Sequence, residues 1–189
     1  MPIDPSKALG APIQGGTFRW DRDRVILYHL GVGAGDPPTD PNELTYTYER
    51  NLKVLPSFGV IPAFGSLGGV GQVPGLQFNP ALLLHGEQDL EIRKPIPVEG
   101  EVETSGKVAG IYDKGKAALV VLETETKLKG EAEPLFVNRF SLFLRGEGGF
   151  GGESGPPAGN EAPNRAPDGT VESKTPPQQA LLYRLSGDK

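Results

Sequence analysis

The sequence contains no cysteine. Without a thiol it can form no disulfide scaffold, no cysteine-based zinc site and no thiol nucleophile. Histidine is almost as scarce, because His29 and His85 are the two in the chain and neither has a second histidine or a carboxylate in a metal-ligand pattern. The sequence therefore predicts no metal site, and any chemistry must come from oxygen and nitrogen groups.

Long apolar runs and blocks of positive charge are missing as well. No stretch approaches the roughly 18 apolar residues of a membrane span, and the start Met1-Pro2-Ile3-Asp4 lacks a basic region followed by an apolar one. The formal net charge is −5, with no run of lysine or arginine that would attract a phosphate backbone. We therefore expect a cytoplasmic protein that binds neither nucleic acid nor membrane.

Motifs of the common nucleotide-binding and hydrolytic classes are absent or out of context. There is no Gly-x-Ser-x-Gly elbow and no Walker lysine motif. Glycine strings at 31–35 and 65–71 lack the strand, turn and helix context of a dinucleotide-binding loop. Alternating glutamates, such as Glu123 and Glu125, are typical of a solvated strand face. None of these patterns supports a serine hydrolase, a phosphate-loop enzyme or a carboxylate-pair active site.

Glycine and proline are abundant, with 27 and 19 residues in a chain of 189. The densest stretch is Gly146 to Pro177, which has almost no large apolar side chain and cannot bury enough surface to fold alone. We interpret 1–145 as one domain, 146–175 as a linker, and 176–189 as the start of a new unit. Thr175 and Gln178 have the spacing of a capping box, which predicts a helix over Pro176–Leu185 with a stripe of leucines.

The pattern after residue 80 predicts an antiparallel sheet. A turn at Asp113-Lys114-Gly115 joins two apolar runs into a hairpin, because glycine supplies the positive φ of a tight turn. In Phe136–Arg145 every second residue is mostly apolar, as in a strand buried on one face. The segments expected to be strands are bounded by proline, glycine or aspartate, namely 82–92, 98–111, 117–127 and 135–145.

Before residue 80 the pattern predicts little regular structure. Asp21 is a plausible N-cap for a short helix over Arg22–Leu30 that follows a short strand at Thr17–Trp20. Thr45–Tyr48 is β-branched and aromatic, which predicts a strand. Pro56–Pro80 alternates apolar residues with glycines, which predicts a broken helix or a flexible cover. The fold class expected is α+β, with a curved antiparallel sheet around little helix.

The two histidines have different expected roles. His29 lies on the predicted first helix, where a solvent-facing or hydrogen-bonded structural role is favoured over catalysis. His85 lies in Leu84-His85-Gly86-Glu87-Gln88, a polar cluster that interrupts an apolar run. Spacing alone favours a structural role, as a buried polar cluster at the start of a strand. The alternative is a binding role, since Gly86 would let another molecule approach the backbone closely.

Several segments, in order, resemble the MaoC-like, type-2 (R)-specific 2-enoyl-CoA hydratases. They cover nearly the whole chain and read Tyr28–Ala34, Val54–Phe58, Leu84–Gln88, Asp113–Gly115, Phe140–Gly152 and Gln179–Asp188. The resemblance implies the first repeat of a double hot-dog fold, in which the central helix is replaced or broken to house an acyl chain. Phe58, Phe64, Leu67 and Phe78 would then be candidate wall residues, although core packing is their more ordinary role.

The resemblance also implies site residues. Asp188 matches the aspartate of the family's catalytic motif, and His85, Gly86 and Lys114 would bind the acyl-CoA substrate. Lys114 would lie near the CoA moiety, or else would be an ordinary turn lysine in solvent. The asparagine and histidine that follow in the family motif come after Lys189, so we expect the chain to be a fragment, a truncated product or one subunit of a split enzyme.

The implied function is that of the substrate-binding half of an enzyme that hydrates trans-2-enoyl-CoA to (R)-3-hydroxyacyl-CoA in fatty-acid metabolism. No cofactor is implied beyond the CoA thioester, which is the substrate. The expected partner is a second hot-dog repeat, in cis or in trans, or a second copy in a homodimer. The alternatives are a non-catalytic module that binds acyl-CoA or an acyl carrier, and a structural dimerisation partner.

Overall fold

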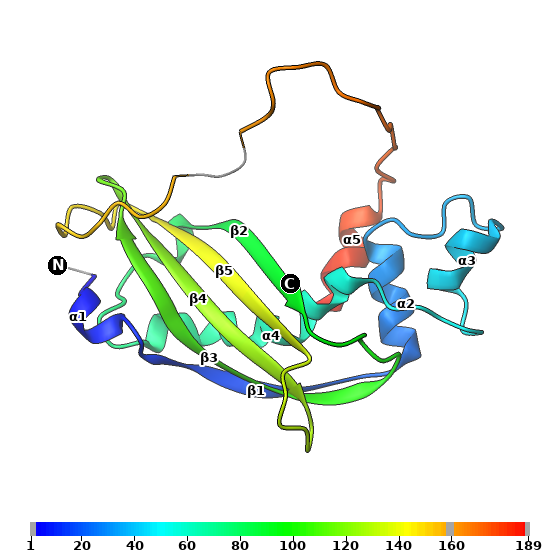
Figure 1. Ribbon diagram of the computed structural model, residues 1–189, viewed down its shortest axis with the longest axis horizontal. Helices are drawn as coiled ribbons and strands as arrows, with labels where there is room; N and C mark the ends of the chain where they lie inside the picture. Colours follow the sequence, from blue (N-terminus) through cyan, green and yellow to red (C-terminus); the bar gives the residue numbers. More distant parts are fainter. Residues whose placement is uncertain (1–2, 158–160, 188–189) are drawn as a thin grey trace.

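A five-stranded antiparallel sheet forms the body of the computed structural model, which describes residues 3–157 and 161–187 (Figure 1). The strand order is β1-β3-β4-β5-β2, so β1 and β2 are the edges. The strands predicted after residue 80 are confirmed to within two residues. They are β2 (Leu83–Ile92), β3 (Gly100–Asp113), β4 (Ala117–Leu128) and β5 (Phe136–Arg145). The short strand predicted at Thr17–Trp20 is the second half of β1, Pro12–Trp20, which begins five residues earlier.

The predicted hairpin is β3 and β4, and its turn is built as expected. Gly115 has a φ of +77°, and its N–H donates to Oδ1 of Asp113 at 2.8 Å. The predicted alternation along β5 is also confirmed. Its buried face consists of Phe136, Asn138, Phe140, Leu142 and Leu144. One face of the sheet is therefore apolar and must be covered.

The predicted first helix is α2, Arg22–Gly31, and Asp21 caps it by accepting the Arg24 N–H at 3.0 Å. Its buried face includes Val25, Tyr28 and His29, whereas the apolar Leu30 is 38% exposed. The difference arises because the helix packs beside the end of the sheet through its aromatic side, where the Tyr28 and Phe58 rings meet edge to face at 5.5 Å.

The strand predicted at Thr45–Tyr48 is wrong, since this segment belongs to the helix α3, Pro41–Thr47. Asp40 accepts the Asn42 N–H at 2.7 Å, and Pro41 occupies the first helical position. The Thr47 hydroxyl donates to the Glu43 carbonyl at 3.0 Å. Local capping and back-bonding therefore outweigh the β propensity of the threonines and tyrosines.

The predicted broken helix is confirmed for the segment that covers the buried face of the sheet. Three short pieces follow one another, η1 (Pro56–Gly59), α4 (Val60–Ala63) and η2 (Phe64–Gln72), and η3 (Pro80–Leu82) leads into β2. Ala63 and Val70 pack into one core cluster with Phe140 and Leu142. A Cβ on Gly59 would lie 3.2 Å from the Leu90 side chain, so glycine lets the cover approach β2 closely.

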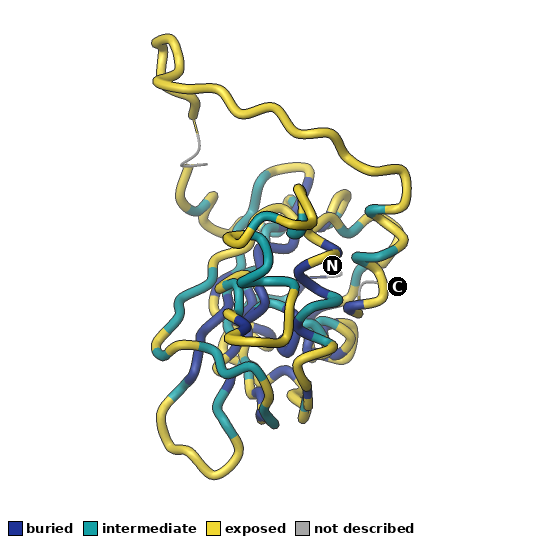
Figure 2. Tube along the Cα trace, turned by 90° about the vertical axis from the view of Figure 1, so that its right-hand side faces the viewer, coloured by how far each residue is buried: buried dark blue, intermediate teal, exposed yellow. Residues whose placement is uncertain are grey.

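The glycine- and proline-rich stretch contains neither helix nor strand in its described residues, 146–157 and 161–177. It leaves the hairpin end of the sheet and crosses to the far side as an exposed strap (Figures 1 and 2). The chain then enters α5 (Gln179–Tyr183) and η4 (Arg184–Ser186), which pack on α2. The remaining helix, α1 (Pro5–Ala8), lies near the start of β1.

The helix predicted from Pro176 begins three residues later than expected, and the predicted capping box does not form. The Gln179 side chain instead donates to the Leu30 carbonyl at 2.9 Å and to the Gly31 carbonyl, at the end of α2. The leucine stripe is not buried either, since Leu181 is 64% exposed and Leu185 49%. Contact with α2, rather than an N-terminal cap, therefore decides where α5 lies.

His29 has the structural role that the sequence favours. Its ring is completely buried, with Nδ1 at 2.6 Å from the Tyr46 carbonyl and Nε2 accepting the Leu55 N–H at 3.0 Å. These two contacts require a neutral ring that carries its proton on Nδ1. Burial lowers the pKa of His29 from 6.5, and the Tyr46 carbonyl opposes that shift only in part.

We expect His29 to make the protein less stable in acid. Because its pKa is lowered in the folded state, the unfolded chain binds a proton first, and stability falls as the pH drops below about 6.5. The His29→Gln variant should lose this dependence between pH 7 and pH 5. Thermal unfolding followed by circular dichroism at several pH values tests this. Parallel pH profiles for the two proteins would contradict the assignment.

Asn138 should be the most sensitive polar residue of the sheet. Its Nδ2 donates to the Gly59 carbonyl at 3.1 Å, and its Oδ1 accepts from Gln88 at 2.9 Å. Asn138→Leu leaves the Gly59 carbonyl unpaired and should lower the free energy of unfolding by about 2 kcal/mol. Urea unfolding measures this, with Asn42→Leu on the exposed face of α3 as the control. Equal effects in both variants would refute the role.

Candidate functional site

The inner surface of β1 borders a cavity of about 320 Å³, here named the β1–α4 cavity. Its apolar walls are Phe18 on β1, Ile61 and Pro62 on α4, and Phe64 at the start of η2. Thr17, Ser66, Arg24 and Ser186 add polar groups, and Gly187 closes one side. The site is therefore a mostly apolar space with a few polar groups, as small-molecule pockets usually are.

Several glycines line this cavity. Gly15 and Gly16 line it where β1 shifts register against β3, and a Cβ on Gly15 would overlap the Thr104 carbonyl. Gly65 faces open space, with no atom within 4 Å of where its Cβ would be. A continuous helix with ordinary side chains would fill this volume. The glycine pattern that predicts a broken helix therefore also leaves the cavity open.

A second cavity of about 810 Å³, here named the β1–α2 cavity, lies between the end of β1 and α2. It is acidic, because four carboxylates and two guanidinium groups line it, from Asp21, Asp23, Glu99, Glu101, Arg19 and Arg24. The exposed Lys129 ammonium beside Glu101 lowers the pKa of that carboxyl. Arg24 lines both cavities, and its guanidinium lies 4.7 Å above the Phe18 ring.

His85 lies on the edge strand β2 and is exposed, so the prediction of a buried polar cluster is wrong. The pairing with β5 shifts between His85 and Glu87, and this bulge at Gly86 turns the His85 ring towards Phe140, 5.8 Å away. The ring of Phe64, at the start of η2, also lies near Phe140, at 6.4 Å. His85 is thus connected to the β1–α4 cavity through aromatic contacts without lining it.

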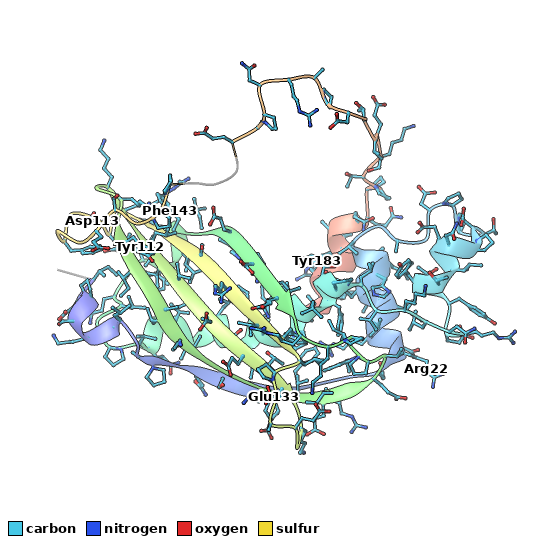
Figure 3. The ribbon with its side chains drawn as sticks, viewed as in Figure 1. Arg22, Tyr112, Asp113, Glu133, Phe143 and Tyr183 are labelled. Atoms are coloured by element: carbon cyan, nitrogen blue, oxygen red, sulfur yellow. The ribbon has the colours of Figure 1, made fainter. Side chains whose placement is uncertain are left out.

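Lys114 stands at the hairpin tip, where its Nζ donates to the Pro156 carbonyl at 3.2 Å. Beside it the Asp113 carboxylate accepts the N–H groups of Gly149 and Gly151 at 2.9 and 2.8 Å, which lowers its pKa. Figure 3 shows Asp113 at the sheet end where the strap begins. The strap is therefore anchored to the hairpin over its first residues and is not a free linker there.

The residues named from the sequence do not converge on one cavity. Lys114 lies in the turn after β3, and two strands, β4 and β5, separate β3 from β2, the strand of His85. Of the four candidate wall residues Phe64 lines the β1–α4 cavity, whereas Phe58 is wholly buried between Trp20 and Tyr28. Asp188 lies outside the described residues. The sequence offered no signal for Arg24, and Ser186 was visible only as part of a family-like segment.

Two negative findings apply to residues 3–157 and 161–187. No group of three histidine, aspartate or glutamate side chains there is placed to hold a metal ion. No helix in this part of the chain is long and apolar enough to cross a membrane.

Comparison with known proteins gives a consistent result. The family model described as the MFE-2 hydratase 2 N-terminal domain matches residues 18–146. The enoyl-CoA hydratase ChsH3 of Mycobacterium tuberculosis is 41% identical over 191 residues, which cover 100% of this chain and 66% of that protein. The peroxisomal multifunctional enzyme type 2 of Mus musculus is 44% identical over 188 residues, covering 96% and 25%. The chain thus spans two thirds or less of these relatives.

Solved structures agree with the sequence matches. A MaoC-like dehydratase from Phytophthora capsici superposes with a TM-score of 0.78 at 30% identity, covering 98% of this chain and 65% of that one. The full-length peroxisomal multifunctional enzyme type 2 of Drosophila melanogaster gives 0.73 at 33% identity, covering 94% and 30%. These likenesses confirm the predicted hot-dog fold.

The anchoring of the strap can be tested at Asp113. Asp113→Ala removes the acceptor for the Gly149 and Gly151 N–H groups and should free the segment 146–157, so that limited proteolysis cuts it several times faster. The control is Asp168→Ala, in the exposed part of the strap, where the carboxylate binds only Arg165. Mass spectrometry of the fragments locates the cuts. Equal cleavage of 146–157 in both variants would contradict the anchoring.

Proposed function

The chain belongs to the family of MFE-2 hydratase 2 N-terminal domains, and we propose on that premise that it is the substrate-binding half of an (R)-specific enoyl-CoA hydratase. The complete enzyme would hydrate trans-2-enoyl-CoA to (R)-3-hydroxyacyl-CoA, as a hydro-lyase of fatty-acid metabolism. The observation that carries the proposal is the β1–α4 cavity, an apolar space beside the interrupted helix. A fatty acyl chain is the ligand that such a space suits.

The reaction sets clear demands on a site. A water oxygen adds to the β-carbon while a proton is delivered to the α-carbon, and negative charge on the thioester oxygen must be stabilised between these steps. By family resemblance Asp188 is one of the groups that hold the water and move its protons. The described chain reaches the β1–α4 cavity at Ser186 and Gly187, immediately before that residue. This continuity supports placing the reacting end of the acyl group near Ser186.

The CoA moiety is proposed to extend along the outside of the sheet. The resemblance assigns His85, Gly86 and Lys114 to substrate binding, and in the structure all three are on or near the surface. An exposed ammonium such as that of Lys114 suits a phosphate or a polar pantetheine. Because His85 and Gly86 lie on β2 and Lys114 lies in the turn between β3 and β4, the two places need separate variants in a binding experiment.

A second hot-dog repeat, in cis or in trans, or a second copy of the chain, is the proposed partner. Strand β2 pairs on one side only, with β5, and its residues 84–89 are exposed. An unpaired strand edge that includes an exposed leucine, Leu84 at 43%, favours association with another chain or domain.

The cellular compartment stays a prediction. The sequence favours the cytoplasm, while the relatives from Arabidopsis thaliana and mouse are named as peroxisomal.

The acyl site can be tested by filling it. Gly65→Leu places a side chain in the β1–α4 cavity and should weaken decanoyl-CoA binding roughly tenfold, the equivalent of ~1.4 kcal/mol of lost apolar burial. The matched control is Gly68→Leu, which also faces open space but does not line the cavity. Titration calorimetry of the 189-residue chain gives both dissociation constants.

Two results would contradict the proposal. One is decanoyl-CoA binding no tighter than CoA alone, and the other is an equal loss in Gly65→Leu and Gly68→Leu. Hydration itself is measured by the loss of enoyl absorbance in a chain extended through the family's catalytic histidine, with Asp188→Asn as the inactive variant. Tight binding without turnover in that extended chain would favour the non-catalytic acyl-binding module instead.

A further inference from the structure

Two residues that line the β1–α4 cavity each carry a buried polar atom without a hydrogen-bond partner. The atoms are Nε of Arg24, on α2, and Oγ of Ser186, on η4. Ser186 is 2% exposed, so its hydroxyl is closed to water in the unliganded protein, and a ligand oxygen can reach it only when the side chains around it shift. The described residues contain one other such side-chain atom, Oγ1 of Thr124, which lies on β4 away from the cavity.

An unpaired buried donor is costly, because folding removes it from water without replacing the lost hydrogen bond. Arg24 forms no ion pair with any described residue. The nearby Asp21 carboxylate is occupied with the Arg24 backbone N–H and does not pair with the guanidinium. Stacking on Phe18 occupies the flat face of the guanidinium and leaves its N–H edge free to donate.

The surroundings of the two atoms indicate what would satisfy them. Among residues 3–157 and 161–187, no carboxylate side chain lines the β1–α4 cavity, whereas four line the neighbouring β1–α2 cavity. An oxygen that carries negative charge is therefore favoured on the β1–α4 side of Arg24 and disfavoured on the other. The remaining walls, Phe18, Ile61, Pro62 and Phe64, require that the rest of the ligand be apolar.

We propose that Arg24 and Ser186 form an oxygen-binding pair that holds an acceptor oxygen, a carboxylate or a hydroxyl, of an otherwise apolar acyl ligand. Arg24 is then a specificity-determining residue of the acyl site. The inference rests on the proposed function for the nature of the ligand. The oxygen has two sources, the 3-hydroxyl at the reacting end of the acyl group or a carboxylate at the far end of an oxidised chain.

The first experiment uses three small probes with the same chain, octanoate, 1-octanol and octylammonium, titrated into the 189-residue protein. The protein should bind octanoate about tenfold more tightly than octylammonium, and its affinity for 1-octanol should lie between the two. In Arg24→Met this preference should collapse to within about twofold. The matched control is Arg19→Met, because Arg19 lines only the β1–α2 cavity. An unchanged preference in Arg24→Met overturns the proposal.

Ser186→Ala tests the pair from its other side and removes a single hydroxyl. It should weaken the binding of octanoate and 1-octanol about fivefold. The unliganded protein should be at least as stable as the wild type, because an unsatisfied buried group has been removed. Thr124→Val is the control, since it removes a comparable unpaired hydroxyl away from the cavity and should leave probe binding unchanged. Undiminished binding of the oxygenated probes in Ser186→Ala overturns the proposal.

A final comparison separates the two sources of the oxygen. The 3-hydroxyoctanoyl and 7-carboxyheptanoyl thioesters of CoA are titrated beside octanoyl-CoA. If Arg24→Met weakens the binding of the 3-hydroxyoctanoyl thioester alone, the pair lies at the reacting end. If it weakens the binding of the 7-carboxyheptanoyl thioester alone, the pair lies at the far end. An equal loss of affinity for all three thioesters overturns the proposed pair. If the wild-type protein binds none of the thioesters, the proposed function fails. The preference for octanoate over octylammonium tests the pair independently of that result.

Discussion

The cavity depends on how an interrupted helix is held against the sheet. Asn138 fixes it, because one side of its amide binds the Gly59 carbonyl of η1 and the other binds Gln88 of β2. The cover is thereby tied to β5 and β2 where Gly59 allows close approach. Beyond this point, glycines prevent a continuous, well-filled helix over Phe64–Gln72. The segment is held to the sheet at η1 and has few side chains over η2, so a space is left beside β1.

The far end of the chain completes that space. The strap carries the backbone from the hairpin end of the sheet to α2, where Gln179 binds the last carbonyls of that helix. The ring of Tyr183, which is labelled in Figure 3, lies 6.3 Å from the ring of Tyr28. A Cβ on Gly31 would lie only 3.0 Å from the Tyr183 backbone, so α5 approaches α2 closely. Ser186 and Gly187 are consequently placed against β1 and η2, which are distant in sequence.

In the described part of the chain, three buried side-chain atoms have no hydrogen-bond partner, on Arg24, Thr124 and Ser186, and other buried polar groups are paired. His29 bridges two backbone groups, and the hydroxyls of Thr104 and Thr126 bind each other at 3.0 Å. Such pairing is the rule in folded proteins, because an unpaired buried donor or acceptor is costly. Arg24 and Ser186 depart from it in the same cavity. The departure is what a binding site is expected to show before its ligand arrives.

The sequence by itself determined the strands after residue 80, the 113–115 turn, the Asp21-capped helix and the broken helix, because alternation, capping and glycine act over a few neighbouring residues. It misjudged Thr45–Tyr48, where a helix cap outweighed β propensity, and the start of α5, which contact with α2 sets. Tertiary structure alone decided that Arg24 and Ser186 share a cavity, since no local pattern relates a residue of α2 to one that returns after a long strap.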